Sequence, residues 1–182
     1  MRTQSPGVAR RTISDGMLSS SYRPLKTTTH RNTDTARQMT PRDPNFLLRF
    51  AKNSADLAAA QRLRYAVFVA ELGAGGGDVD HLNQLEKDRF DPFFDHLLLL
   101  DQNRAADDQV IGAYRLQRLD QAEKAGGFYS AREYDLAPLL QSGRKLLELG
   151  RSCVHPDYRG GTAMFELWSG LARYIAEQQI EI

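Results

Sequence analysis

The chain is poor in cysteine and in long apolar runs. Cys153 is the only cysteine among 182 residues, so it has no partner for an internal disulfide and no second thiol for a C-x-x-C pair. This usage fits a reducing compartment, and we expect a cytoplasmic protein. The longest apolar run, "LLLL" at 97–100, is far shorter than the roughly 18 residues that cross a bilayer. The residues after Met1 show no secretory apolar region, so export is not indicated.

Several catalytic signatures are also missing. The sequence contains no G-x-S-x-G, no H-E-x-x-H, no Walker loop and no G-x-G-x-x-G, so no metal site, resident cofactor or nucleic-acid partner is predicted. The segment "HLLLLD" does match an H-x4-D acyltransferase pattern, from His96 to Asp101. Its four leucines indicate a strand, however, and residues five apart on a strand face opposite ways. We therefore reject this motif.

Charge is distributed unevenly along the chain. Residues 1–42 hold eight Arg or Lys against two Asp, a net +6, and the other residues hold sixteen against twenty-one, a net −5. The first segment is rich in Ser and Thr and lacks apolar periodicity, so we expect a disordered basic arm. Its composition suits a solvated tail, an arm that meets an anionic membrane or an acidic partner, or a transit peptide.

The remaining residues, 43–182, show the patterns of one folded domain. Strands are predicted at 45–51, 96–102, 110–118 and 145–154, with an antiparallel hairpin across the polar turn after residue 102. A helix capped by Asn53 or Ser54 is expected to run to Gly73, and a second helix is expected from 162 to 179. The segments 73–84 and 119–127 are expected to be irregular.

This order predicts an α/β fold, a mostly antiparallel sheet flanked by helices. The last predicted helix would normally lead into another strand. We therefore expect that C-terminal strands are missing, and that the chain is a fragment or is completed by a partner.

The strand "LLELGRSC" (146–153) carries Glu148, Gly150 and Arg151 among its leucines. On a regular strand Glu148 and Arg151 would face opposite sides. A bulge at Gly150 would bring both onto one face, toward a shared pocket, and would leave main-chain N–H groups unpaired. Such N–H groups beside a carboxylate suit acyl transfer, in which they polarise a carbonyl while the acid accepts a proton. A buried structural ion pair is the alternative.

Other charged residues point to a polar cleft. Arg115 lies within a predicted strand, and a buried arginine needs a carboxylate partner. Arg64 lies on the first helix, and Asp88, Asp91 and Asp95 precede a strand. Together these residues suggest a site that positions a charged substrate, although each could instead be a surface, loop or cap residue.

The turn "HPDYRGG" (155–161) opens the last helix, and its glycines and N–H groups would suit a phosphate. A plain strand–helix connection is the alternative. Cys153 lacks an evident His partner, so a small core residue is expected rather than a nucleophile.

Five segments resemble the L-ornithine N-acyltransferases that begin ornithine-lipid synthesis, a family with the GNAT-type fold. They are "AAQRLRYAVFVAELGA", "FDPFFDHLLLLD", "VIGAYRLQR", "GFYSAREYDL" and "LELGRSCVHPDYR", in this order over about residues 45–175. The resemblance implies transfer of a 3-hydroxyacyl chain from acyl carrier protein to the α-amino group of L-ornithine. The product would be lyso-ornithine lipid. Because this product is a lipid, the enzyme is expected to be cytoplasmic with possible peripheral contact at the inner face of the membrane.

The resemblance also implies roles for residues at matching positions. Glu148, Arg151 and Asp91 would be catalytic. The substrate would be bound by Arg64, Phe68, Asp88, Arg115, Phe128, Ser152 and Cys153. The phosphopantetheine of the donor would meet Arg159, Gly160 and Gly161, where Thr162 and Met164 depart from the acetyl-CoA pattern Q/R-x-x-G-x-G/A.

Two other functions stay open. The same positions are similar to acyl-homoserine lactone synthases, which would use S-adenosylmethionine as acceptor. Ala74 stands where those synthases usually have tryptophan, and "DPFFDHLL" favours the ornithine branch. A non-catalytic fragment that binds acyl carrier protein is the third reading.

Overall fold

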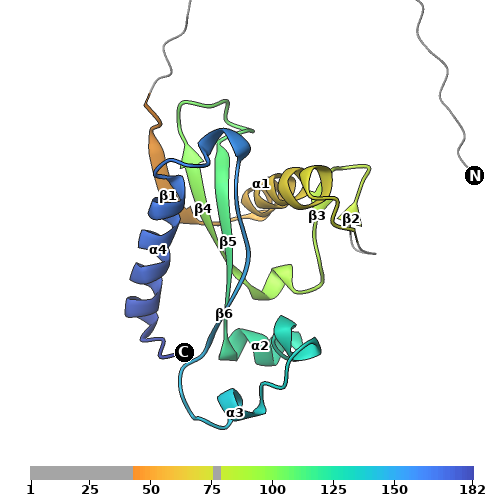
Figure 1. Ribbon diagram of the computed structural model, residues 1–182, viewed down its shortest axis with the longest axis vertical. Coiled ribbons are helices and arrows are strands. Elements are labelled where there is room, and N and C mark those ends of the chain that lie inside the picture. Colours follow the sequence, from red (N-terminus) through yellow and green to blue (C-terminus); the bar gives the residue numbers. More distant parts are fainter. Residues whose placement is uncertain (1–42, 76–78) are drawn as a thin grey trace, which may run out of the picture. The chain divides into compact units, whose positions relative to one another are not determined.

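The computed structural model describes residues 43–75 and 79–182. The predicted basic arm, 1–42, lies outside the described residues. The centre of the described part is an antiparallel sheet in the order β1-β4-β5-β6 (Figure 1). Its strands are β1 Phe46–Phe50, β4 Asp95–Asp101, β5 Val110–Arg118 and β6 Leu147–Val154. A small hairpin pairs β2 Val79–Asp80 with β3 Leu85–Glu86.

Helices and single turns connect and cover these strands. The α-helices are α1 Ser54–Arg64, α2 Leu119–Ala125, α3 Ala137–Leu140 and α4 Ala163–Gln178. A π-helical segment, η1 Tyr65–Glu71, continues α1. Three 3-10 turns are η2 Asp91–Phe93, η3 Tyr129–Arg132 and η4 Pro156–Tyr158.

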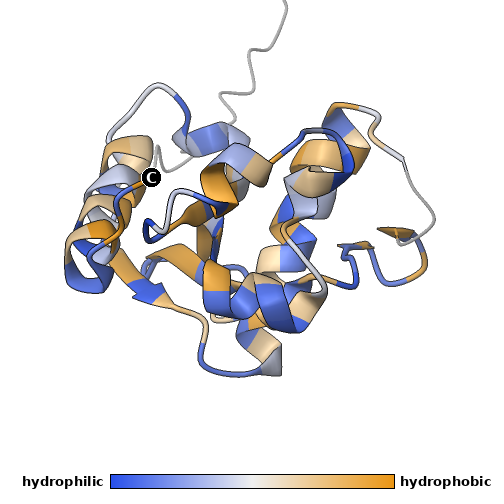
Figure 2. Cartoon of the chain, turned by 90° about the horizontal axis from the view of Figure 1, so that it is seen from below, coloured by the Kyte–Doolittle hydropathy of each residue, from blue (hydrophilic) through white to orange (hydrophobic). Residues whose placement is uncertain are grey.

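The sheet lies between two helical layers, with α1 on one side and α4 on the other (Figure 1). Strand β4 is buried on both faces, which requires a helix on each side of the sheet. Leu97 and Leu99 pack with Leu167 of α4, whereas Leu98 and Leu100 pack with Leu63 of α1. A strand covered on both faces carries a continuous apolar run instead of an alternating one. Figure 2 shows helices of mixed hydropathy around the more apolar strands, as expected for helices that bury one side only.

The predicted fold class, strands and hairpin are confirmed. Asn53 caps α1, because its side chain accepts a hydrogen bond from the Asp56 N–H at 2.9 Å. Gly73 ends the helical segment with φ of +71°, a backbone conformation that suits glycine. The sequence did not indicate that the last turns widen into a π-helix.

Of the two segments predicted to be irregular, 73–84 is mostly turn and loop in its described residues, whereas 119–127 is mostly helical. Residues 73–84 contain β2, which pairs with β3. Residues 119–125 form α2, where Gln121 accepts a hydrogen bond from the Arg118 N–H at 2.8 Å and Gly126 closes the end in the left-handed conformation. Both elements are too short to produce a clear hydrophobic period.

Candidate active site

The predicted irregularity of β6 is present, one residue further along. Gly150 pairs with Arg115 and Cys153 pairs with Ala113, so β6 has one residue more than β5 between these pairs. Arg151 has φ of +51°, whereas the prediction placed the bulge at Gly150. An arginine rarely adopts this conformation, which costs on the order of 1–3 kcal/mol unless surrounding contacts hold it.

The bulge turns Arg151 to the face of Glu148, as predicted, and toward the layer of α1. Arg151 Nε donates to Glu86 Oε1 at 2.9 Å, and its Nη2 lies 3.9 Å from Asp88 Oδ2. Burial would lower the pKa of Arg151, but the neighbouring Tyr129 and Glu86 outweigh burial and raise the pKa. The ion pairs therefore hold the strained residue in place.

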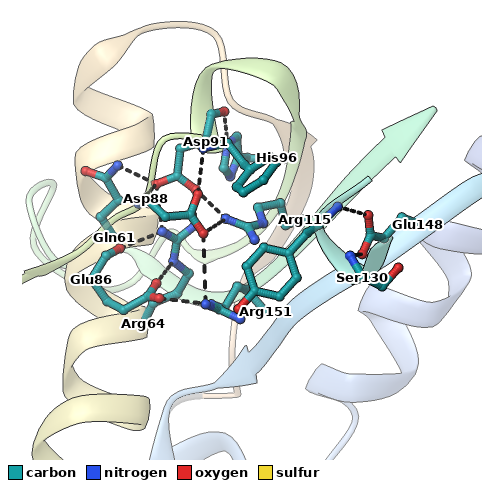
Figure 3. A network of polar contacts seen from close by, with 12 residues as sticks. Gln61, Arg64, Glu86, Asp88, Asp91, His96, Arg115, Ser130, Glu148 and Arg151 are labelled. Atoms are coloured by element: carbon teal, nitrogen blue, oxygen red, sulfur yellow. Dashed lines mark hydrogen bonds and ion pairs between the residues drawn. The ribbon is translucent and has the colours of Figure 1, made fainter. Parts of the chain in front are cut away.

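The prediction that Glu148 and Arg151 point toward one shared pocket is wrong. Glu148 accepts hydrogen bonds from the backbone N–H groups of Tyr129 and Ser130 at 2.8 and 2.9 Å (Figure 3). Its carboxylate lines a hollow of about 110 Å³ with Phe128 and Ser130. Arg151 lines two other hollows, and its guanidinium carbon lies 5.2 Å from the centre of the Tyr129 ring. The two side chains thus share a face, with the Tyr129 turn between them.

A buried network of charges forms the centre of the site (Figure 3). Asp91 accepts hydrogen bonds from Arg64 at 2.8 and 2.9 Å, from Arg115 at 2.9 Å and from Gln61 at 2.8 Å. Arg64 and Arg115 have only 1% and 2% of their surface exposed. The prediction that a buried arginine at 115 requires a carboxylate is therefore confirmed, with Asp88 as a second partner at 2.8 Å.

Asp91 is ionised in this environment. Burial alone would raise its pKa, but the hydrogen bonds and charges of Arg64, Gln61 and Arg115 outweigh burial and hold the pKa well below its usual value. Both carboxylate oxygens are already occupied by donors. This geometry supports a role in positioning the arginines, and a role for Asp91 in proton transfer remains a prediction.

Glu86 is a central residue that no sequence motif indicated. Its Oε2 accepts from Arg64 Nε at 2.6 Å and its Oε1 accepts from Arg151, so one carboxylate joins α1 to β6. The only signal was its place in "LEKDRFD", two residues before Asp88. The roles of Gln61, His96 and Tyr129 were missed as well.

The other aspartate near this strand lies elsewhere. Asp95 accepts hydrogen bonds from Arg118 and Tyr174 at 2.7 and 2.6 Å, so it does not join Asp88 and Asp91. His96 contacts the Asp91 carbonyl oxygen through Nε2 at 2.9 Å, whereas Asp101 binds Tyr158 at 2.6 Å. The rejection of His96 and Asp101 as a catalytic pair is confirmed.

Three of the seven predicted substrate residues line two hollows, whereas Arg64 and Arg115 are buried in the network and line neither. Phe68 and Ser152 line one of about 370 Å³ together with Glu86 and Arg151. Phe128 lies beside Glu148 in the smaller one. Cys153 is buried in the core below α1, and burial raises its pKa to about 12. Its thiol is therefore protonated and inert at neutral pH.

The turn after β6 carries an ion pair. Both Nη atoms of Arg159 bind the Glu71 carboxylate at 2.6 and 2.7 Å. Gly160 has φ of +77°, and Gly161 follows in the turn before α4. A phosphate at this turn would compete with Glu71 for the guanidinium. Within residues 43–75 and 79–182, no cluster of three or more acidic, His or Cys side chains could bind a metal. Likewise, no helix there is both long and apolar enough to cross a membrane.

Four curated relatives are named L-ornithine N(alpha)-acyltransferase. The protein from Rhodobacter capsulatus is 54% identical over 140 residues, 76% of this chain and 54% of its own length. The one from Brucella abortus is 44% identical over 139 residues, 74% of this chain and 50% of its own length. The chain thus spans about half the length of the curated relatives it matches.

Solved structures support the fold. FeeM, an N-acyl amino acid synthase from uncultured soil microbes, matches with a TM-score of 0.56 and 17% identity over 76% of this chain and 69% of its own. The AHL synthase LasI matches with a TM-score of 0.53 and 20% identity over 76% and 70%. The family model "Acetyltransferase (GNAT) domain" matches residues 63–169, which include β4, β5, the bulged β6 and most of the buried network. The chain belongs to the GNAT acetyltransferase family.

Proposed function

We propose that the chain transfers a 3-hydroxyacyl group from acyl carrier protein to the α-amino group of L-ornithine, which gives lyso-ornithine lipid. The observation that carries this proposal is the shared name of its curated relatives. The bulge of β6 lies beside a hollow and a buried array of charges. This arrangement supports acyl transfer as the chemistry. Acyl carrier protein and ornithine would be cytoplasmic partners, and no resident cofactor is required.

The reaction would proceed without an acyl-enzyme. The amine nitrogen attacks the thioester carbon, an N–C bond forms and the amine proton passes to a base. Collapse of the tetrahedral intermediate breaks the C–S bond, and the phosphopantetheine thiolate leaves and takes up a proton. Amines are mostly protonated near neutral pH, so the enzyme must provide a proton acceptor.

Glu148 is our candidate base, directly or through water. Its oxygens accept one backbone N–H each, and a carboxylate oxygen has a second lone pair for an incoming ammonium. Arg151 and Ser152 have no paired residue on β5. We assign main-chain N–H groups from Arg151 to Cys153 to the developing oxyanion. Arg64, Asp88, Asp91 and Arg115 would shape the cleft behind them.

The test is a transfer assay with purified chain, 3-hydroxyacyl carrier protein and L-ornithine, with product detected by mass spectrometry. We expect N-acylornithine, and a Glu148→Gln variant slower by about 10²–10⁴-fold. Glu177→Gln, an exposed change on α4, is the matched control. Acyl-homoserine lactone formed from S-adenosylmethionine, with no acylornithine, would contradict the proposed acceptor. Near-normal turnover of Glu148→Gln would remove Glu148 from the role of base.

A further inference from the structure

A polar hollow of about 170 Å³ lies on the outer side of the buried network. Gly75 and residues of β2, of β3, of the segment after β3, of η3 and of β6 line it. Those that carry the argument are Glu86, Asp88, Arg89, Phe90, Tyr129 and Arg132. Glu86, Asp88 and Arg151 of the buried network therefore form one wall of the hollow, and Arg89, Phe90, Tyr129 and Arg132 form the rest of the part that carries the argument.

Two arginines from different segments meet at one ring in this hollow. The guanidinium carbons of Arg89 and Arg132 lie 4.5 and 5.0 Å from the centre of the Phe90 ring. Neither forms an ion pair with any residue in the described part of the chain, whereas Arg151 beside them is paired with Glu86. Two positive groups against one neutral ring leave an excess of positive charge facing the hollow.

Both exposed arginines lie against the ring of a buried residue. Phe90 is 2% exposed, and its backbone N–H donates to Asp88 Oδ1 at 2.8 Å. The Tyr129 ring packs edge-on against the Phe90 ring, with the ring centres 5.5 Å apart. Arg132 ends η3, the turn whose first two N–H groups bind Glu148. Guanidinium groups bind planar anions such as carboxylates through paired hydrogen bonds.

The same hollow also presents negative groups. The side chains of Glu86 and Asp88, only 10% and 11% exposed, line it. Cationic and anionic groups in one small hollow match a zwitterion, with the α-carboxylate of ornithine at the arginines and its side-chain ammonium at the acids. A free amino acid has this charge pattern.

We propose that Arg89 and Arg132 bind the α-carboxylate of the amino-acid acceptor and thereby select amino acids over simple amines. This inference rests on the proposed function, since it concerns the acceptor of that reaction. The Glu148–η3 contact would then link the candidate base to the residue that orients the amine.

The experiment compares L-ornithine with L-ornithinamide, which lacks the α-carboxylate, in the transfer assay. Arg89→Gln and Arg132→Gln are changes at exposed positions, and Arg173→Gln on α4 is the matched control. We expect each single variant to raise the KM for ornithine about 10-fold, the loss of one charge-assisted hydrogen-bonding partner. The double variant should no longer prefer ornithine to ornithinamide. The KM for the acyl carrier protein should stay constant in all variants.

Two results would overturn the inference. One is an unchanged preference for ornithine over ornithinamide in the double variant. The other is a rise in the KM for acyl carrier protein alone, which would make the arginines a docking surface for the acidic carrier.

The failure of this inference can be separated from failure of the proposed function. Other amino acids can be offered together with their amides, so the arginines are tested whichever acceptor the enzyme uses. If a different amino acid is the acceptor and the double variant loses the preference for it over its amide, the inference stands. If no acceptor reacts, calorimetric titration of L-ornithine into wild type and double variant replaces the assay. Equal binding by both proteins would then overturn it.

Discussion

Arg151 donates a hydrogen bond from Nε to Oε1 of Glu86 at 2.9 Å, across 65 residues of sequence. The other oxygen of the same carboxylate binds Arg64 at 2.6 Å. One buried acid thus joins the first helix to the bulge of β6. Because Arg151 has an unfavourable backbone conformation, this contact also stabilises the shape of the strand that carries the proposed oxyanion site.

Asp91→Asn should strongly destabilise the protein. The change leaves Arg64 and Arg115 buried with less negative charge, and loss of one partner of a buried ion pair costs about 3–5 kcal/mol. Asp108→Asn, which removes an exposed partner of Arg104, should cost less than about 1 kcal/mol. Urea unfolding of both variants checks the difference. Similar midpoints for the two would show that the network contributes little to stability.

Gly170→Ala should destabilise α4 packing although alanine favours helices. A Cβ at this position would overlap Leu48 and approach Leu97 Cδ2 at 3.2 Å. Overpacking costs about 1–3 kcal/mol, more than the gain of about 1 kcal/mol in helix propensity. The measurement is the thermal midpoint, with Ser169→Ala on the same helix as control. A higher midpoint for Gly170→Ala would contradict the tight contact between α4 and β1.

His96 should make stability depend on pH below neutrality. Burial lowers its pKa in the folded state, and its Nε2 carries the proton because it meets the Asp91 carbonyl oxygen, which only accepts. As pH falls below the unfolded pKa of about 6.5, the unfolded chain binds the proton first and stability is lost. Wild type should therefore lose more stability between pH 7 and pH 5 than His96→Gln. Parallel slopes for the two proteins would argue against a buried neutral imidazole.

Cys153 should resist alkylation in the folded protein. Burial raises its pKa to about 12, so almost no thiolate is present at pH 8. Mass spectrometry after iodoacetamide treatment should find the native chain unmodified and the urea-unfolded chain fully modified. Cys153→Ala should retain acyl transfer, because only the backbone N–H of this residue is proposed to act. Loss of activity with an intact fold would implicate the thiol itself.

Much of the scaffold could be predicted because its signals are local. The Asn53 cap, the apolar run of β4, the β4–β5 hairpin and the irregular β6 each depend on residues close in sequence. Even the need of Arg115 for a carboxylate follows from the cost of burying a charge. The short elements β2 and α2 were missed because a few residues cannot establish a hydrophobic period.

The sequence by itself determined the alternation of strands and helices and the presence of an acid and an arginine around a kink in β6. Only the tertiary structure decided which groups these side chains meet. Glu86 binds Arg64 and Arg151, and Glu148 binds the Tyr129 turn instead of facing Arg151. Such partners lie 19 to 65 residues apart. The packing of α1 and η3 against β6 determines the distances between them, which no local pattern encodes.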